Sequence, residues 1–225
     1  MNKLIVDKEN IVTIDNNVID LEIQKEKLTI NIKGKVLIND LTGLEENLNV
    51  VINLTSGSEL VYNNFKKGKI NQQITLNQEE NSTLVYNYSI LATDKSSLKI
   101  DASIRGSNTN CKIFVKTVTK DKGSIIVTAT GDILKNVINN KYLENIRTLS
   151  LNQEENTIIP NLFVNSNNIE ALHNATISSI SHSDLFYLNS KGISEEAAKK
   201  LIMKGFLINN LELSDEDKRK IENII

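Results

Sequence analysis

Few residues in this chain could perform chemistry, and their spacing argues against an active site. Ser181, His182 and Asp184 have the residue types of a hydrolase triad, but near neighbours in sequence cannot converge on one reacting atom. The pairs Glu79-Glu80 and Glu154-Glu155 fall between apolar segments, which is typical of a solvated surface rather than of acid–base catalysis. No glycine-rich phosphate loop of standard spacing occurs. We therefore assign no catalytic residue.

Two side chains could bind a metal. Cys111 is the single cysteine, which excludes an intramolecular disulfide and any site made wholly of this chain's thiolates. We place it in the connection before a strand at 112–116, as a partly buried and inert thiol. His173 lies where the strand pattern ends and before the helical tail begins. Spacing alone favours a structural histidine held by the backbone over a ligand.

Composition sets the class of protein. The chain has 225 residues, 40% of them hydrophobic, and a net charge of −2, so no overall field attracts nucleic acid or an anionic membrane. No segment approaches the roughly 20 apolar residues of a spanning helix, and no secretory signal is present, so we expect a cytoplasmic protein. Asparagine is abundant, with 32 residues. An AT-rich genome explains this abundance, and so do turns that need left-handed backbone angles.

The elements that must position these residues are mostly strands. From Lys3 to about Val164 the polarity alternates with a period of two, in segments rich in β-branched residues. The clearest segments are 4–6, 18–23, 28–32, 49–54, 84–90, 97–102, 112–116 and 124–129. So many strands without intervening helices predict a sandwich, a barrel or a solenoid.

A near-repeat favours the solenoid. Residues 75–83, TLNQEENST, closely resemble residues 150–158, SLNQEENTI, and the spacing of 75 residues corresponds to about three solenoid rungs. Coincidence in a background rich in Asn, Glu and Lys is the competing explanation. We predict a mainly β body over residues 1–180, with the solenoid favoured, followed by a small helical subdomain over 181–225.

The tail carries helix signals. Residues 183–192 predict a short helix with Ser183 as N-cap and Gly192 at the left-handed position after its end. Residues 194–207 predict a second helix capped by Ser194, with one apolar stripe at positions 198, 201, 202, 205 and 206. A third helix is predicted after Ser214, with Ile221, Ile224 and Ile225 on its apolar face.

Ordered motifs in this region resemble the C-terminal signature of the SufB/SufD family. They are PNLFV at 160–164, NIEALHNAT at 168–176, LFYLNSKGI at 185–193, EAA at 196–198 and KGF at 204–206. The family pattern is approximately P-x-L, V-x-A-x-H-x-A-T, L-F-Y-L-x-S-R-G-I, E-A and G-F. The matching block extends from about Arg147 to Leu207, and the family's parallel β-helix agrees with the strands described above. The resemblance therefore implies a right-handed parallel β-helix over residues 1–180, ahead of the helical subdomain.

The resemblance implies a scaffold for iron–sulfur cluster assembly that pairs with a SufB-type partner, or with itself, and binds the ABC-type ATPase SufC. His173 matches the family histidine at the cluster-building interface, which implies a possible iron ligand for a transient, shared iron–sulfur cluster. The tail matches the ATPase-docking segment. The positions implied for SufC binding are Phe186, Tyr187, Gly192, Ile193, Ala197, Leu201, Gly205 and Phe206.

The chain departs from the family pattern at several positions. Many members have a cysteine two residues before the histidine, where this chain has Ala171. Leu172 and Asn174 flank the histidine in place of the acidic residues of SufB, which favours a SufD-like assignment. Lys191 replaces the usual arginine and loses its planar fork. The helical domain that precedes the β-helix in longer members is expected to be absent.

Function is therefore predicted as a non-enzymatic SufD-like scaffold, with ATP hydrolysis in the partner and no affinity for nucleic acid or membrane. Two alternatives stay open. One is an all-β adhesin or carbohydrate-binding module, which predicts export. The other is a degenerate relative that docks the ATPase without handling clusters, an interpretation that Ala171 and the scarcity of thiols support.

Overall fold

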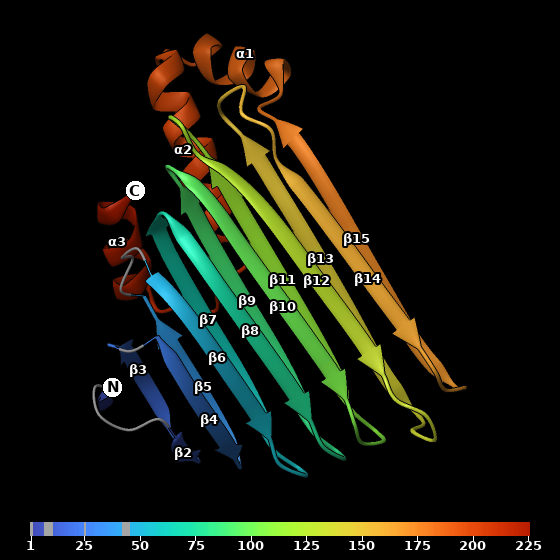
Figure 1. Cartoon of the computed structure of the whole chain (residues 1–225). Coiled ribbons are helices and arrows are strands. Elements are labelled where there is room, and N and C mark those ends of the chain that lie inside the picture. The colour runs from blue at the N-terminus through green and yellow to red at the C-terminus, as the bar shows by residue number, and fades with distance from the viewer. Residues whose placement is uncertain (1, 7–10, 25, 42–45) are drawn as a thin grey trace.

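The computed structural model describes residues 2–6, 11–24, 26–41 and 46–225 (Figure 1). Fifteen strands are followed by three helices in this part of the chain. The strands are β1 (Asn2–Val6), β2 (Ile11–Asp15), β3 (Val18–Ile23), β4 (Lys27–Lys33), β5 (Lys35–Asp40), β6 (Glu46–Leu54), β7 (Glu59–Gly68), β8 (Ile70–Gln78), β9 (Thr83–Ala92), β10 (Lys95–Ile104), β11 (Asn110–Thr119), β12 (Ser124–Ile133), β13 (Asn140–Ser150), β14 (Thr157–Val164) and β15 (Ile169–Ser179). The helices are α1 (His182–Ser190), α2 (Glu195–Ile208) and α3 (Asp215–Ile224).

The strands alternate between two parallel sheets. The odd-numbered strands form one sheet in sequence order from β1 to β15, and the even-numbered strands form the other from β14 to β2. One rung therefore consists of one strand of each sheet, and stacked residues are 24 positions apart at Asn63 and Asn87 and 31 apart at Thr117 and Thr148. The prediction of a parallel β-helix followed by helices is confirmed, and the sandwich and barrel are excluded.

The near-repeat that favoured the solenoid is not a rung repeat. Thr75 pairs with Asp101 in the even-numbered sheet, whereas Ser150 pairs with Thr119 in the odd-numbered sheet. The two copies therefore occupy opposite sheets and do not stack. Rung length varies because the turns differ in length, so no fixed sequence period exists for a repeat to follow.

Side chains that alternate inward form the core between the sheets. The eight segments predicted as strands all lie within strands, and their inward positions are mostly buried Ile, Leu and Val, with Tyr86 and Tyr88 among the other buried residues. The segment around His173, which we expected to follow the last strand, is itself strand β15. Its residues are mostly exposed, so the alternation that marks a half-buried strand is weak there.

Asparagine serves the turns as the composition suggested. Six asparagines in the described residues adopt positive φ, which asparagine tolerates better than most residues. They are Asn16, Asn81, Asn108, Asn136, Asn139 and Asn168. Four of them stack from rung to rung, and each amide donates to the one below: Asn108 to Asn81 and Asn139 to Asn108, both at 3.2 Å, and Asn168 to Asn139.

The helix caps agree with the sequence with one correction. The N-cap of helix α1 lies two residues earlier than predicted, at Ser181, whose Oγ accepts from the Ser183 backbone N–H at 3.2 Å. Gly192 adopts φ +82° just beyond the helix end, as predicted. Ser194 caps α2 as expected, accepting from the Ala197 backbone N–H at 3.3 Å.

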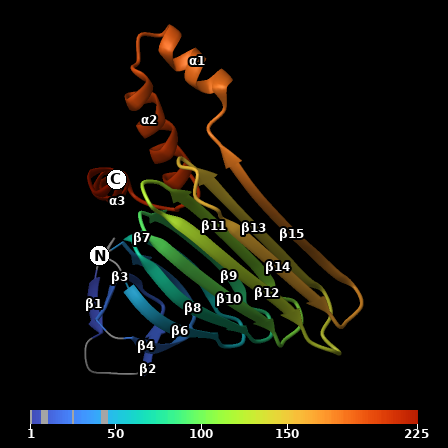
Figure 2. The same cartoon turned by 45° about the horizontal axis from the view of Figure 1, so that its top comes forward.

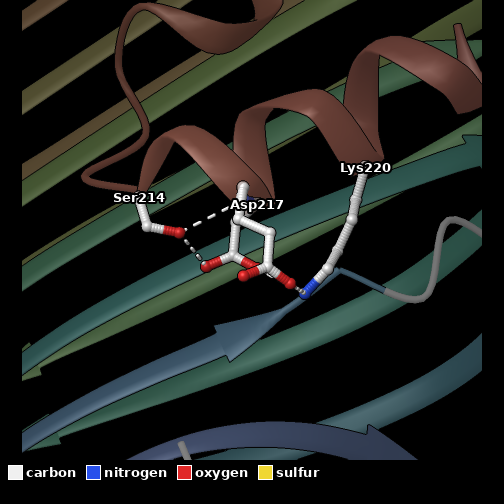
Figure 3. A network of polar contacts seen from close by, with 4 residues as sticks. Ser214, Asp217 and Lys220 are labelled. Carbon is white, nitrogen blue, oxygen red and sulfur yellow. Dashed lines mark hydrogen bonds and ion pairs between the residues drawn. The ribbon is translucent and has the colours of Figure 1, made fainter.

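Helix α3 begins with a polar network (Figure 3). Ser214 Oγ accepts from the Asp217 backbone N–H at 3.2 Å and donates to Asp217 Oδ2 at 2.8 Å, while Lys220 Nζ lies 2.9 Å from Asp217 Oδ1. Burial of the Asp217 carboxyl opposes ionisation, but the hydrogen bonds from Lys220 and Ser214 outweigh it and hold its pKa below the usual range. The charged carboxylate therefore stabilises the first turn of α3.

Helices α2 and α3 cover the outward face of the odd-numbered sheet near the carboxyl ends of its strands (Figure 2). The buried cluster there consists of Phe65, Leu91, Val118, Leu149, Met203, Leu207, Leu211 and Ile221. The predicted stripe on α2 is partly wrong, because Leu201 is exposed and the fully packed residues are Ala198, Met203 and Leu207. No helix in the described residues is long and apolar enough to cross a bilayer.

Candidate functional site

The last rung leaves one end of the solenoid uncovered. In the described residues β14 pairs with β12 alone and β15 pairs with β13 alone, so each strand has one unpaired edge. Large apolar side chains are exposed on these two strands. They are Ile159, Phe163, Val164, Leu172 and Ile177. We call this surface, formed by residues 157–164 and 169–179, the terminal rung.

His173 lies in the middle of the terminal rung. Its register partner is Glu144, which in turn pairs with Ile113 of the buried core. His173 therefore ends a column of side chains that points into the solenoid, and it is exposed because nothing stacks above it. Spacing alone favoured a histidine held by the backbone, and the structure places the imidazole of His173 at the open end of the solenoid.

Glu144 is a buried carboxylate beside the histidine. Its Oε2 accepts from the Tyr142 hydroxyl at 2.7 Å, and its Oε1 has no hydrogen-bond partner in the described residues. Burial raises the pKa of Glu144, and the hydrogen bond from Tyr142 and the charge of His173 oppose that rise. Sequence reasoning missed Glu144, because only the rung register brings it next to a histidine so distant in sequence.

Cys111 lies two rungs below Ala171 in the neighbouring inward column, through Tyr142. It belongs to β11 rather than to the connection before it, and it is fully rather than partly buried. Burial, and then the nearby charge of Glu144, raise the pKa of its thiol. The thiol is therefore protonated at neutral pH and enclosed, so the prediction of an inert cysteine agrees with its surroundings.

The donor set limits what this chain can hold alone. No group of three or more His, Cys, Asp or Glu residues in the described ranges is arranged to bind a metal ion. The terminal rung thus offers one imidazole with a carboxylate beside it. An iron centre, which prefers several thiolate or imidazole ligands, would need the others from a second chain.

The remaining sequence candidates are surface features. Glu79, Glu80, Glu154 and Glu155 are exposed, as predicted for a solvated surface. The residues Ser181 to Asp184 form the start of α1, where Ser181 serves as a cap, so they form no triad.

The helical positions implied for partner binding separate into two groups. Phe186 is 76% exposed and Leu201 is 53% exposed, and Tyr187, Gly192, Ala197 and Gly205 are also exposed. Ile193 is half-buried, and Phe206 packs against the cluster beneath α2. Helices α1 and α2 extend beyond the strand ends in Figure 2, so the exposed group is accessible to another protein.

Comparison with known families agrees with this architecture. Residues 46–206 match the family described as "SUF system FeS cluster assembly, SufBD core domain". The chain belongs to the SufBD family. The match runs from β6 through the terminal rung into α2, so it begins well before the block near Arg147 that the motifs indicated.

Individual SufBD relatives are similar over a shorter segment. Proteins of Staphylococcus saprophyticus and Staphylococcus haemolyticus, both named iron–sulfur cluster assembly SufBD family proteins, are 35% identical to this chain over 107 residues. A protein of the same family name from Staphylococcus aureus is 34% identical over 107 residues. In each case the match covers 46% of this chain and 22% of the relative.

Proposed function

We propose that this SufBD chain is a non-catalytic scaffold subunit for iron–sulfur cluster assembly in the cytoplasm. The observation that carries the proposal is the family match over residues 46–206, which runs from β6 and includes the open terminal rung with His173. A scaffold needs a rigid surface that holds ligands and partners in fixed positions. Two ladders of parallel strands supply that rigidity.

The partner subunit is proposed to bind at the terminal rung. The unpaired edges of β14 and β15 carry backbone groups that a second solenoid could continue by strand pairing. The exposed side chains Phe163 and Leu172 would be buried in the same contact. We propose a SufB-type subunit as this partner, or a second copy of the chain, and a shared edge is compatible with both.

The cluster is then cargo held between two chains. His173 would supply one imidazole ligand to iron, with Glu144 beside it, and the thiolates would come from the partner because Cys111 is enclosed. A single ligand from this side suits a cargo that must leave again. The terminal rung would therefore form half of a transient site.

The ATPase is proposed to bind the exposed group on α1 and α2. Phe186, Tyr187 and Leu201 are large apolar side chains exposed on adjacent helices, which is typical of a protein contact. We propose SufC as the ATPase and place ATP hydrolysis in that partner. The buried residues Met203 and Leu207 would anchor the docking helices to the sheet, so movement of the ATPase would reach the scaffold directly.

Co-purification tests the ATPase contact. The full chain is expressed with SufC from the same organism, and Leu201→Asp is compared with Ile126→Asp, a similarly exposed apolar residue on the other sheet. Leu201→Asp is expected to abolish recovery of the ATPase, and Ile126→Asp is expected to leave it unchanged. Equal recovery with wild type and both variants would contradict the proposed contact, and recovery of the scaffold alone in every case would favour the adhesin.

Cluster delivery tests the terminal rung. His173→Ala is compared with His182→Ala, which removes the other histidine of the chain from an exposed position at the start of α1. We expect maturation of an iron–sulfur client enzyme to fall with His173→Ala and to persist with His182→Ala. If both variants support maturation while Leu201→Asp does not, the chain docks the ATPase without handling clusters, a second candidate that the enclosed Cys111 favours.

A further inference from the structure

Two cations lie side by side on the outward face of the odd-numbered sheet. Lys116 of β11 and Arg147 of β13 are register partners, so their backbones are about 4.8 Å apart. Both approach the ring of Phe206 from α2, with Lys116 Nζ 5.2 Å and Arg147 Cζ 5.6 Å from the ring centroid. Neither cation forms an ion pair with any acidic residue in the described ranges. Lys116 Nζ donates to Asn209 Oδ1, which leaves its other N–H donors for a further acceptor. Like charges at this spacing repel, and the ring balances only part of the repulsion.

A cavity of about 440 Å³ opens beside the pair, where the segment after α2 crosses the sheet. Its lining contains Lys116, Arg147, Phe114, Asn210 and Glu212. Glu212 is the single acidic residue among the lining residues, so two positive charges face one negative charge. We call this hollow the cationic cavity.

Amide groups add donors to the cationic cavity. Asn210 Oδ1 accepts from Ser89 Oγ at 3.0 Å, which leaves the amide nitrogen as the free end of the side chain. That nitrogen is buried and has no hydrogen-bond partner in the described residues. The two cations and this unused N–H make the surroundings of the cavity electropositive, which favours an acceptor with several oxygens.

Burial of Lys116, and then the charge of Arg147, lower the pKa of the lysine to about 8. The ammonium is therefore still mostly protonated at neutral pH, but at a cost that an anion would remove. A phosphate monoester carries about 1.5 to 2 negative charges at pH 7 and three acceptor oxygens. The planar fork of Arg147 suits two of those oxygens, and the point charge of Lys116 suits the third.

We propose that the cationic cavity binds a small phosphate-bearing organic molecule, with its phosphoryl group between Lys116 and Arg147. The volume exceeds what a phosphate ion alone requires, and cavities of this size hold small organic ligands. The ring of Phe114 offers an apolar wall to the carbon skeleton, and Glu212 can accept from a hydroxyl group. Arg147 is the register partner of Thr176 in the terminal rung, but the lining of the cavity contains no residue of that rung, so the proposal does not depend on the proposed scaffold function.

Titration calorimetry on the full chain tests the proposal, with glycerol 3-phosphate as the probe, glycerol as the neutral control and malonate as a dianion without phosphorus. The variants are Lys116→Met and Arg147→Met. Lys112→Met is the matched control. Lys112 is an exposed residue of strand β11 that lies on the same outward face as Lys116, four residues before it. Circular dichroism establishes that each variant is folded, and Arg147→Lys keeps the charge if Arg147→Met does not fold.

We expect saturable binding of glycerol 3-phosphate, weakened about tenfold or more by Lys116→Met and by Arg147→Met, as for the loss of one charge-assisted hydrogen bond. Arg147→Lys is expected to weaken binding less than Arg147→Met, and Lys112→Met to leave the affinity unchanged. No saturable binding up to about 10 mM, or equal weakening by Lys112→Met, would overturn the proposal. Tighter binding of malonate than of the phosphate ester would overturn the choice of phosphate.

Discussion

Lys66→Met removes the ammonium of an ion pair inside the solenoid. Lys66 Nζ of β7 lies 2.7 Å from Asp40 Oδ1 of β5, and both side chains are fully buried. The hydroxyl of Tyr62 also donates to Asp40, at 3.3 Å to Oδ2. Methionine has nearly the length of the lysine stem and is apolar, so this change removes charge while it leaves little empty space.

The expected cost follows from what the substitution leaves behind. Removal of one partner from a buried ion pair leaves an uncompensated charge and costs about 3–5 kcal/mol of folding free energy. Asp40→Leu is expected to cost a similar amount, because it leaves the ammonium of Lys66 enclosed. The double variant removes both charges, so its stability is expected to return close to that of the wild type.

Urea unfolding of the full chain, followed by far-ultraviolet circular dichroism, measures these differences. The control is Lys35→Met, which breaks the 3.1 Å ion pair between Lys35 and Glu59 on the same two strands. Both of those side chains are largely exposed, so we expect a loss of no more than about 1 kcal/mol. The reasoning fails if Lys66→Met costs as little as Lys35→Met, or if the double variant is as unstable as the two single variants combined.

Four further predictions concern the helices and the cationic cavity. Leu207→Ala is expected to destabilise the chain by about 2–5 kcal/mol in urea unfolding, because the Leu207 side chain of α2 is fully buried against the sheet. Leu201→Ala, on the exposed side of the same helix, is expected to cost less than about 0.5 kcal/mol. Equal losses from the two substitutions would contradict the packing. Ser214→Ala is expected to cost about 1 kcal/mol by loss of the α3 cap. Because the pKa of Asp217 is lower in the folded chain than in the unfolded chain, the ionised carboxylate stabilises the fold at pH values above its unfolded pKa. This stabilisation is lost as pH falls through the folded pKa. The unfolding free energies of wild type and Asp217→Asn are therefore expected to converge in acid. The pKa of Lys116 is lowered to about 8 in the folded chain, so the charged ammonium opposes folding below pH 8. The unfolding free energy of wild type relative to Lys116→Met is therefore expected to rise between pH 8 and the ordinary pKa of lysine. If this free-energy difference does not vary with pH, burial of the ammonium is contradicted.

Local patterns predicted eight of the strands in the described residues, the cap of α2 and the start of α3 after Ser214. Alternation of polarity is a property of a single strand, because successive side chains point to opposite faces, so it is visible without knowledge of the neighbours. The caps at Ser194 and Ser214 are equally local, since each hydroxyl bonds to a backbone group three residues later. The cap of α1 was displaced by two residues because the segment contains two serines, Ser181 and Ser183, and only backbone geometry decides between them.

The candidate site could be predicted only in part. Motifs identified His173, but not that it lies on a strand at an open end, because exposure depends on whether another rung follows. The near-repeat at 75-residue spacing was misleading for a related reason. Rung length is set by each turn separately, so equal spacing in sequence does not imply stacking in space.

By itself the sequence determined the class of the fold and the family, since both are written in strand periodicity and in short ordered motifs. The tertiary structure alone decided which distant side chains meet. It places Glu144 beside His173 and Lys116 beside Arg147 as register partners, and it brings Asp40 and Lys66 together as a buried ion pair. The physical reason is that parallel pairing aligns residues a whole rung apart, and the burial that makes these pairs energetically important arises only when the rungs stack.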